Sequence, residues 1–79
     1  MNYADAIKGC SRYCEQTIPD YKERVAVALG TMDRERCTIE SADYRLADEI
    51  ATAIEDWCTD NDCETLVDDI TEWDIIFNG

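Results

Sequence analysis

The clearest pattern in the chain is an amphipathic stretch between Ser41 and Thr59. Its apolar residues recur every three or four positions, which places them on one face of an α-helix. Ser41 is a suitable N-cap for this helix, and Asp43 then falls in its first turn. The apolar face consists of Leu46, Ala47, Ile50, Ala53, Ile54, Trp57 and Cys58, and the opposite face of Asp48, Glu49, Thr52, Glu55, Asp56 and Thr59.

A second stripe with helical spacing begins near the N-terminus and contains Tyr3, Ile7, Cys10 and Cys14. Asn2 is the expected N-cap, and the helix should end near Thr17 because proline at position 19 disfavours helical geometry in the residue before it. Gly9 costs this helix about 1 kcal/mol relative to alanine, which suggests that a neighbouring element packs closely against it.

The next helix is expected to begin at Pro19 or Asp20, with Gly30 near its end. The sequence VAVAL within it also suits a strand, but the spacing of the surrounding apolar residues favours a helix. Its expected apolar face is Tyr21, Val25, Ala28, Leu29 and Met32. After it, Cys37, Thr38 and Ile39 are expected to enter the core as an extended link or a short strand.

The C-terminal third is expected to form short elements after a break at residues 59–62. Asp62 is a candidate cap for a short helix that turns Leu66, Val67 and Ile70 inward. The final segment TEWDIIF is apolar enough to dock as either a helical turn or a short strand. The pattern thus predicts an all-α fold: a bundle of three to four helices in one compact domain, 1–79, with any extended segment near 37–39 or 73–77.

The distribution of charge divides the chain into two unlike halves. The net charge is −12, from 19 acidic and seven basic residues. Residues 1–39 hold six of each, so the excess acids lie in residues 40–79, where Arg45 is the single base. The acidic surface should therefore be concentrated in 40–74. Such asymmetry favours a basic partner and disfavours direct binding to nucleic acid or an anionic membrane.

Catalytic and cofactor signatures are missing from the sequence. It contains no histidine to activate a nucleophile and no glycine-rich phosphate loop, so we expect neither an enzyme nor a cofactor. Asp60, Asp62 and Glu64 alternate as in a calcium loop, but Thr65 stands where that loop needs glycine. No apolar run of membrane-spanning length and no export signal are present, which predicts a cytoplasmic protein.

The cysteines are expected to be reduced core residues, because their number is odd and no export signal precedes them. A four-thiolate zinc site from Cys10, Cys14, Cys58 and Cys63 is the alternative, but the expected positions on apolar helix faces explain these residues without metal. The fifth cysteine is Cys37. We therefore predict no metal site.

A small, acidic, helical chain of this kind resembles, in overall profile and without a diagnostic motif, the phage-encoded anti-CRISPR proteins that act as DNA mimics. The resemblance implies an inhibitor that occupies the basic nucleic-acid-binding surface of a Cas effector or surveillance complex in the host cytoplasm. Carboxylates would then stand in for phosphates. The expected partner-binding residues are Asp48, Glu49, Glu55, Asp56, Asp60, Asp62, Glu64, Asp68 and Asp69.

The alternative is a small helical protein–protein interaction module, either monomeric or homodimeric, that uses apolar contacts. In this interpretation the C-terminal residues form an interface instead of closing the core. The residues concerned are Trp57, Trp73, Ile75, Ile76 and Phe77.

Overall fold

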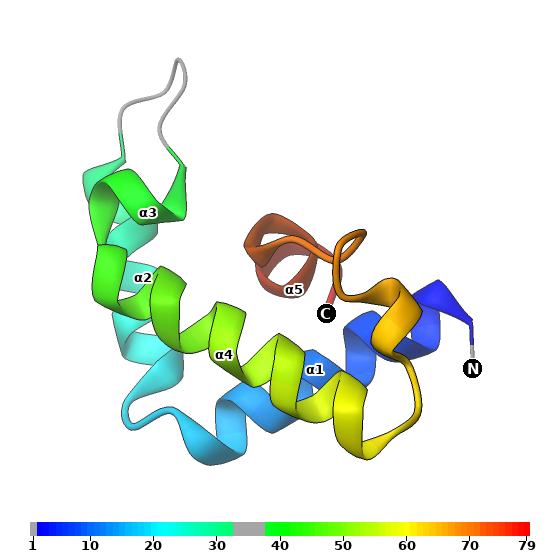
Figure 1. Cartoon of the computed structure of the whole chain (residues 1–79). Coiled ribbons are helices and arrows are strands. Elements are labelled where there is room, and N and C mark those ends of the chain that lie inside the picture. The colour runs from blue at the N-terminus through cyan, green and yellow to red at the C-terminus, as the bar shows by residue number, and fades with distance from the viewer. Residues whose placement is uncertain (1, 33–37) are drawn as a thin grey trace.

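The computed structural model describes residues 2–32 and 38–79, and within them it contains helices and turns but no strand (Figure 1). The prediction of an all-α bundle is confirmed, and the strand alternative for 73–77 is wrong. In chain order the elements are α1 (Tyr3–Thr17), α2 (Tyr21–Thr31), α3 (Ile39–Ala42), α4 (Tyr44–Asp60), the 3-10 turn η1 (Glu64–Leu66) and α5 (Glu72–Asn78).

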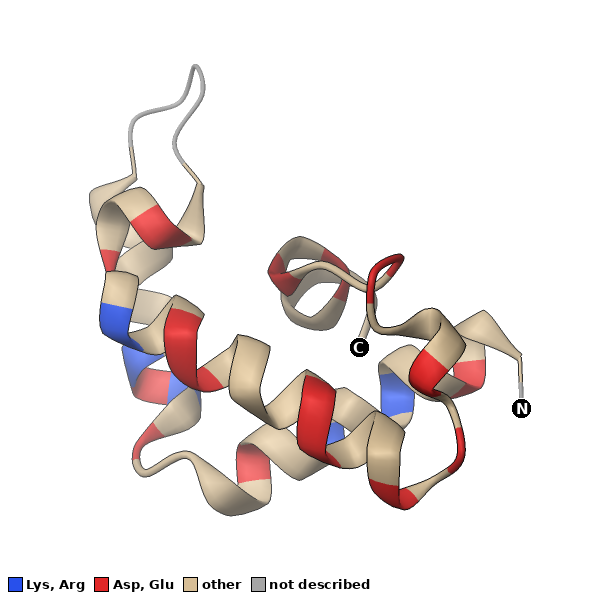
Figure 2. Ribbon diagram, in the orientation of Figure 1, with Lys and Arg blue, Asp and Glu red and all other residues tan. Residues whose placement is uncertain are grey.

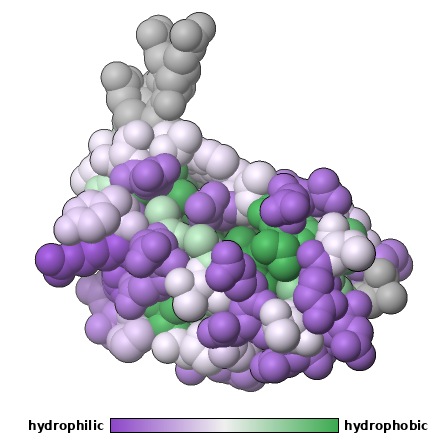
Figure 3. All heavy atoms as spheres, viewed as in Figure 1, coloured by the Kyte–Doolittle hydropathy of each residue, from purple (hydrophilic) through white to green (hydrophobic). Residues whose placement is uncertain are grey.

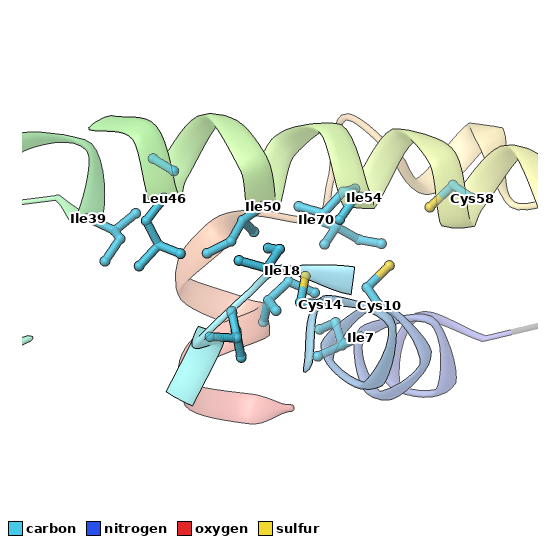
Figure 4. Close-up of a cluster of buried hydrophobic side chains, with 14 of the residues drawn as sticks. Ile7, Cys10, Cys14, Ile18, Ile39, Leu46, Ile50, Ile54, Cys58 and Ile70 are labelled. Carbon is cyan, nitrogen blue, oxygen red and sulfur yellow. The ribbon is translucent and has the colours of Figure 1, made fainter. Parts of the chain in front are cut away.

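The core lies where the apolar faces of α1 and α4 meet (Figure 4). Ile7, Cys10 and Cys14 of α1 face the apolar side of α4, and Ile18 and Ile70 fill the space beside them. α5 packs mainly on α1 and also contacts α4, and α3 packs on the start of α4. The apolar stripe predicted for α4 is confirmed: Leu46, Ala47, Ile50, Ala53, Ile54 and Cys58 are buried, and Trp57 is half-buried.

The start of α4 differs from the prediction that Ser41 caps it. Ser41 lies inside α3, whose own cap is Thr38, and Asp43 separates the two helices with a φ of −152°. The Asp43 carboxylate accepts a hydrogen bond from the backbone N–H of Leu46 at 3.0 Å, so Asp43 is the N-cap. Both residues are good caps, and the backbone break decides which of them acts.

The segment expected to be an extended link is helical only from Ile39 onward. Cys37 lies outside the described residues. Thr38 is extended and exposed, so the prediction that it enters the core is wrong, whereas Ile39 is the first residue of α3. Only 1% of Ile39 is exposed, so this side chain does enter the core as predicted.

α2 begins at Tyr21, after a turn in which Asp20 has a left-handed φ of 55° and no capping hydrogen bond. Only Tyr21 and Ala28 of the predicted apolar face are buried. The remaining residues of that face, Val25, Leu29 and Met32, are half-buried. α2 therefore lies at the edge of the core.

Asp62 does not cap a helix, and that prediction is wrong. Its φ of 57° reverses the chain after α4, and Cys63 precedes the single 3-10 turn η1. Ile70 is buried as predicted, whereas Leu66 and Val67 are half-buried.

α5 is capped at its start and fastened to α1. The Thr71 side chain accepts from the N–H of Asp74, and the Asp74 carboxylate accepts from the N–H of Thr71, which completes a capping box. The same carboxylate accepts a 2.5 Å hydrogen bond from the Tyr3 hydroxyl. Tyr3, expected in the core, is 38% exposed because its hydroxyl reaches across to α5.

The aromatic residues of α5 are only partly docked. Ile75 is 1% exposed and belongs to the core, as expected for a docked segment. Phe77 was expected to pack inside but is 58% exposed, and its ring stacks on Trp73 with centroids 4.8 Å apart. A seven-residue helix turns only one face inward, and Phe77 lies away from that face.

The neighbour expected at Gly9 is Trp57 of α4. A Cβ placed on Gly9 would overlap the six-membered ring of the Trp57 indole. Glycine at this position therefore allows the helices to approach around the largest side chain of their interface.

We predict that Gly9→Ala lowers the free energy of unfolding by up to about 2 kcal/mol, because the overlap with Trp57 outweighs the gain in helix propensity. Urea denaturation measures this change. Gly30→Ala is the matched control: nothing lies within 4 Å of its Cβ, so it should raise stability by roughly 0.5–1 kcal/mol. Stabilisation by both substitutions would contradict the close approach at Gly9.

We predict that Tyr3→Phe lowers the melting temperature by a few degrees, because it removes the hydrogen bond that holds α5. That bond lowers the pKa of Asp74, so its contribution is complete above the ordinary aspartate pKa of about 3.9 and is lost as the pH falls through the lower folded value. It also raises the pKa of Tyr3 to about 12, so the contribution is complete below the ordinary tyrosine pKa of about 10 and is lost as the pH rises through the folded value.

Circular-dichroism melts at pH values that span the titrations of Asp74 and Tyr3 would measure the difference in melting temperature between Tyr3→Phe and the wild type. The difference should be constant between pH 5 and 9, within about a degree, and should shrink in stronger acid. Tyr44→Phe is the control, since its hydroxyl bonds only to Arg45 among the described residues. A difference that persists unchanged in acid would rule out Asp74 as the partner.

Candidate functional site

Five of the nine predicted partner-binding residues lie on α4 away from its buried face, and Figure 2 shows acidic positions from near the start of this helix to its end. All five are exposed, and the helix that carries them is fixed by its buried opposite face. We call this set the acidic ridge: Asp48, Glu49, Glu55, Asp56 and Asp60.

Averaged along the helix axis, the density of carboxylates on the ridge is comparable to that of phosphates along one nucleic-acid strand. Asp48 and Asp60 are twelve residues apart, which corresponds to about 18 Å along the helix axis. Five carboxylates over that length give roughly one charge per 4 Å, whereas one DNA strand carries one per about 3.4 Å of axis. The ridge therefore approaches the charge density of one strand, and not that of a duplex.

One ridge carboxylate is neutralised by a base from the first half of the chain. The guanidinium of Arg24 in α2 lies 2.5 Å from the carboxylate of Glu49. Arg45, the single base of residues 40–79, contacts Tyr44: its Nε donates to the Tyr44 hydroxyl at 3.3 Å. Glu49 is thus part of the link between α2 and α4 and is less available to a partner than Asp48.

The other four predicted residues lie beyond α4. Asp62 and Glu64 continue from the C-terminal end of the ridge into η1. Asp68 and Asp69 lie in the link to α5, and the Asp69 carbonyl accepts a 3.1 Å hydrogen bond from the Tyr3 hydroxyl. This contact fastens the link to the start of α1. The predicted set therefore divides into the ridge, its C-terminal extension and a separate link.

Two shallow grooves run beside the ridge, and Asp48 borders both. The groove toward α1 has a volume of about 240 Å³ and is lined by Tyr13, Thr17, Ile18, Asp48, Glu49, Thr52, Ala53 and Asp56. The groove toward α5, which we call the α4–α5 groove, has a volume of about 310 Å³ and is lined by Glu40, Tyr44, Ala47, Asp48, Ala51 and Glu72.

Sequence reasoning did not identify Glu40, Tyr44 and Glu72 as site residues. The signal that could have found Tyr44 is its position one helical turn before Asp48, where an aromatic residue stands on the polar face. Glu40 and Glu72 reach the groove from α3 and α5, and no local pattern in the sequence links them to α4.

The described cysteines, Cys10, Cys14, Cys58 and Cys63, are buried in the core, as predicted, and no disulfide joins any two of them. Burial raises the pKa of Cys10 to about 12 and that of Cys14 to about 11. These thiols stay protonated at neutral pH, which is the opposite of an activated nucleophile. In residues 2–32 and 38–79, no three histidine, cysteine or acidic side chains are grouped as a metal site would require.

Within the described part of the chain, no helix combines the length and the apolar character needed to cross a membrane. Comparison of the chain with protein-family models, with curated proteins and with solved structures finds no match.

Proposed function

We propose that this protein is a non-enzymatic inhibitor whose acidic ridge occupies the basic nucleic-acid-binding surface of a host defence complex, in the manner of an anti-CRISPR DNA mimic. The partner is a Cas effector or surveillance complex, and the step that it blocks is the binding of target DNA. The protein acts in the cytoplasm, where that complex meets DNA.

The observation that carries this proposal is the row of unpaired carboxylates on α4. No ion pair with a described residue is formed by Asp48, Glu55, Asp56 or Asp60. Their mutual repulsion does not stabilise the helix. A basic surface would relieve that repulsion. Such a partner supplies lysine and arginine side chains spaced to meet phosphates.

The rigidity of the ridge supports the same proposal. The opposite face of α4 is buried in the core, so the carboxylates project from a fixed helix. A preorganised row of charges loses little conformational freedom on binding, which favours affinity. The attraction is screened over about 8 Å at physiological salt, so binding should weaken and slow as salt rises.

We predict that reversing Asp48, Glu55 and Asp56 to lysine abolishes inhibition and leaves the fold intact. All three side chains are exposed, and Glu49 is left unchanged because it pairs with Arg24. The measurement is the mobility shift of labelled target DNA by purified Cas effectors and surveillance complexes, with the inhibitor titrated at low and high salt. The affinity of the variant should fall by at least about a hundredfold.

The control variant carries the same change in charge elsewhere, at Asp5, Glu15 and Glu23, which are also exposed and lie outside the predicted partner-binding set. It should keep most of the inhibition, with a loss below about tenfold. Full inhibition by the ridge variant would refute the proposal. Equal losses for the two variants would mean that net charge acts, and not the ridge.

A second candidate, the apolar interaction module, is favoured by the exposed edge of α5. Phe77 is 58% exposed, and its stacking partner Trp73 is half-buried. This surface is small, because Ile75 is in the core and Trp57 packs over Gly9. A specific interface usually buries at least about 1,200 Å² in total.

We therefore predict a monomer of 9.0 kDa by light scattering in both low and high salt. Phe77→Ser should also be a monomer, because the wild-type chain has no dimer interface for this substitution to disrupt. A dimer that resists salt and is lost in Phe77→Ser would favour the interaction module instead.

A further inference from the structure

The α4–α5 groove combines an apolar floor with an acidic border, and this combination specifies a particular kind of side chain. Figure 3 shows hydrophobic surface between hydrophilic side chains on the face where α4 and α5 adjoin. The floor is formed by Ala47 and Ala51, whose small side chains leave the hollow open. Its volume of about 310 Å³ is at the lower end of the range for binding pockets, which suits one long side chain better than a larger ligand.

The acidic border converges from three helices. Glu40 comes from α3, Asp48 from α4 and Glu72 from α5. None of these three side chains forms a hydrogen bond or ion pair with a described residue. A cation in the groove would therefore meet carboxylates from several directions.

The aromatic wall of the groove indicates which cation is preferred. Tyr44 is 65% exposed, and its ring already contacts a guanidinium, since Cζ of Arg45 lies 5.9 Å from the ring centroid. A guanidinium is planar, carries five donors and is weakly hydrated, so it stacks on an aromatic ring and bridges carboxylates better than an ammonium does. Its methylene stem can lie on the alanine floor.

We propose that the α4–α5 groove binds an arginine side chain presented by the basic partner. This inference rests on the proposed function, because that function supplies a partner with exposed arginines. The ridge then provides long-range attraction. The groove supplies the specific contact that selects arginine over lysine and fixes the register of the complex.

The test uses two blocked peptides of equal charge, one containing arginine and one containing lysine, titrated against the full protein by NMR. The arginine peptide should shift the amide signals of Ala47, Ala51 and Glu72 and should bind about threefold more tightly than the lysine peptide. Equal affinities, or shifts confined to the ridge around Glu55, would overturn the inference.

Two variants separate the shape of the groove from its charge. Ala51→Leu fills the groove without changing its charge and should lower the affinity for the arginine peptide roughly tenfold. Tyr44→Leu removes the aromatic wall and should reduce the preference for arginine about threefold. Glu23→Gln is the control, since it removes one exposed charge from outside both the groove and the ridge and should have less than about a twofold effect. A larger loss in Glu23→Gln than in Ala51→Leu would contradict a groove site.

The same variants distinguish failure of this inference from failure of the proposed function. If the lysine reversals on the ridge abolish inhibition of DNA binding and Ala51→Leu does not, the groove inference is wrong and the proposed function stands. If the arginine preference holds in the groove but no nucleic-acid-binding complex is inhibited, the proposed function is wrong and the groove inference stands.

Discussion

The packing of α1 against α4 is the contact on which the rest of the structure depends. Together with α3 at the start of α4, α1 buries one face of this helix, and the acidic ridge is exposed because it occupies the opposite face. Gly9 permits this packing by making room for the Trp57 indole. The same contact therefore closes the core and directs the carboxylates outward. A chain of 79 residues has only a small apolar core available for this purpose.

The smaller elements are held to this pair by polar contacts at their ends. α5 has only seven residues, too few for a stable isolated helix, and it depends on its capping box and on the Tyr3 hydroxyl. α2 lies at the edge of the core and is joined to α4 through the pair between Arg24 and Glu49. These contacts fix the positions of α2 and α5 beside the ridge, and α5 thereby completes one groove.

The carboxylates of α4 differ in the interactions that each makes within the structure. Glu49 belongs to an internal ion pair, whereas Asp48 borders two grooves and forms no such pair with a described residue. Carboxylates that look equivalent in the sequence therefore differ in what they offer a partner. Long-range attraction depends on the whole ridge, while specific recognition depends on the hollow beside Asp48 and on the ring of Tyr44.

The sequence by itself determined the helical class, the buried stripe of α4 and the close neighbour of Gly9. It also determined the Asn2 cap, whose side chain accepts a hydrogen bond from the N–H of Asp5 at 2.8 Å. Each of these follows from local spacing or backbone propensity. The sequence could not determine that Asp43 and not Ser41 caps α4, that Arg24 neutralises Glu49, or that Tyr3 reaches α5. The sequence also could not show that Glu40 and Glu72 border the same groove. Each of these joins elements far apart in the chain or depends on where the backbone bends. Only the tertiary structure decides such contacts, because residue spacing carries no information about which helix ends meet.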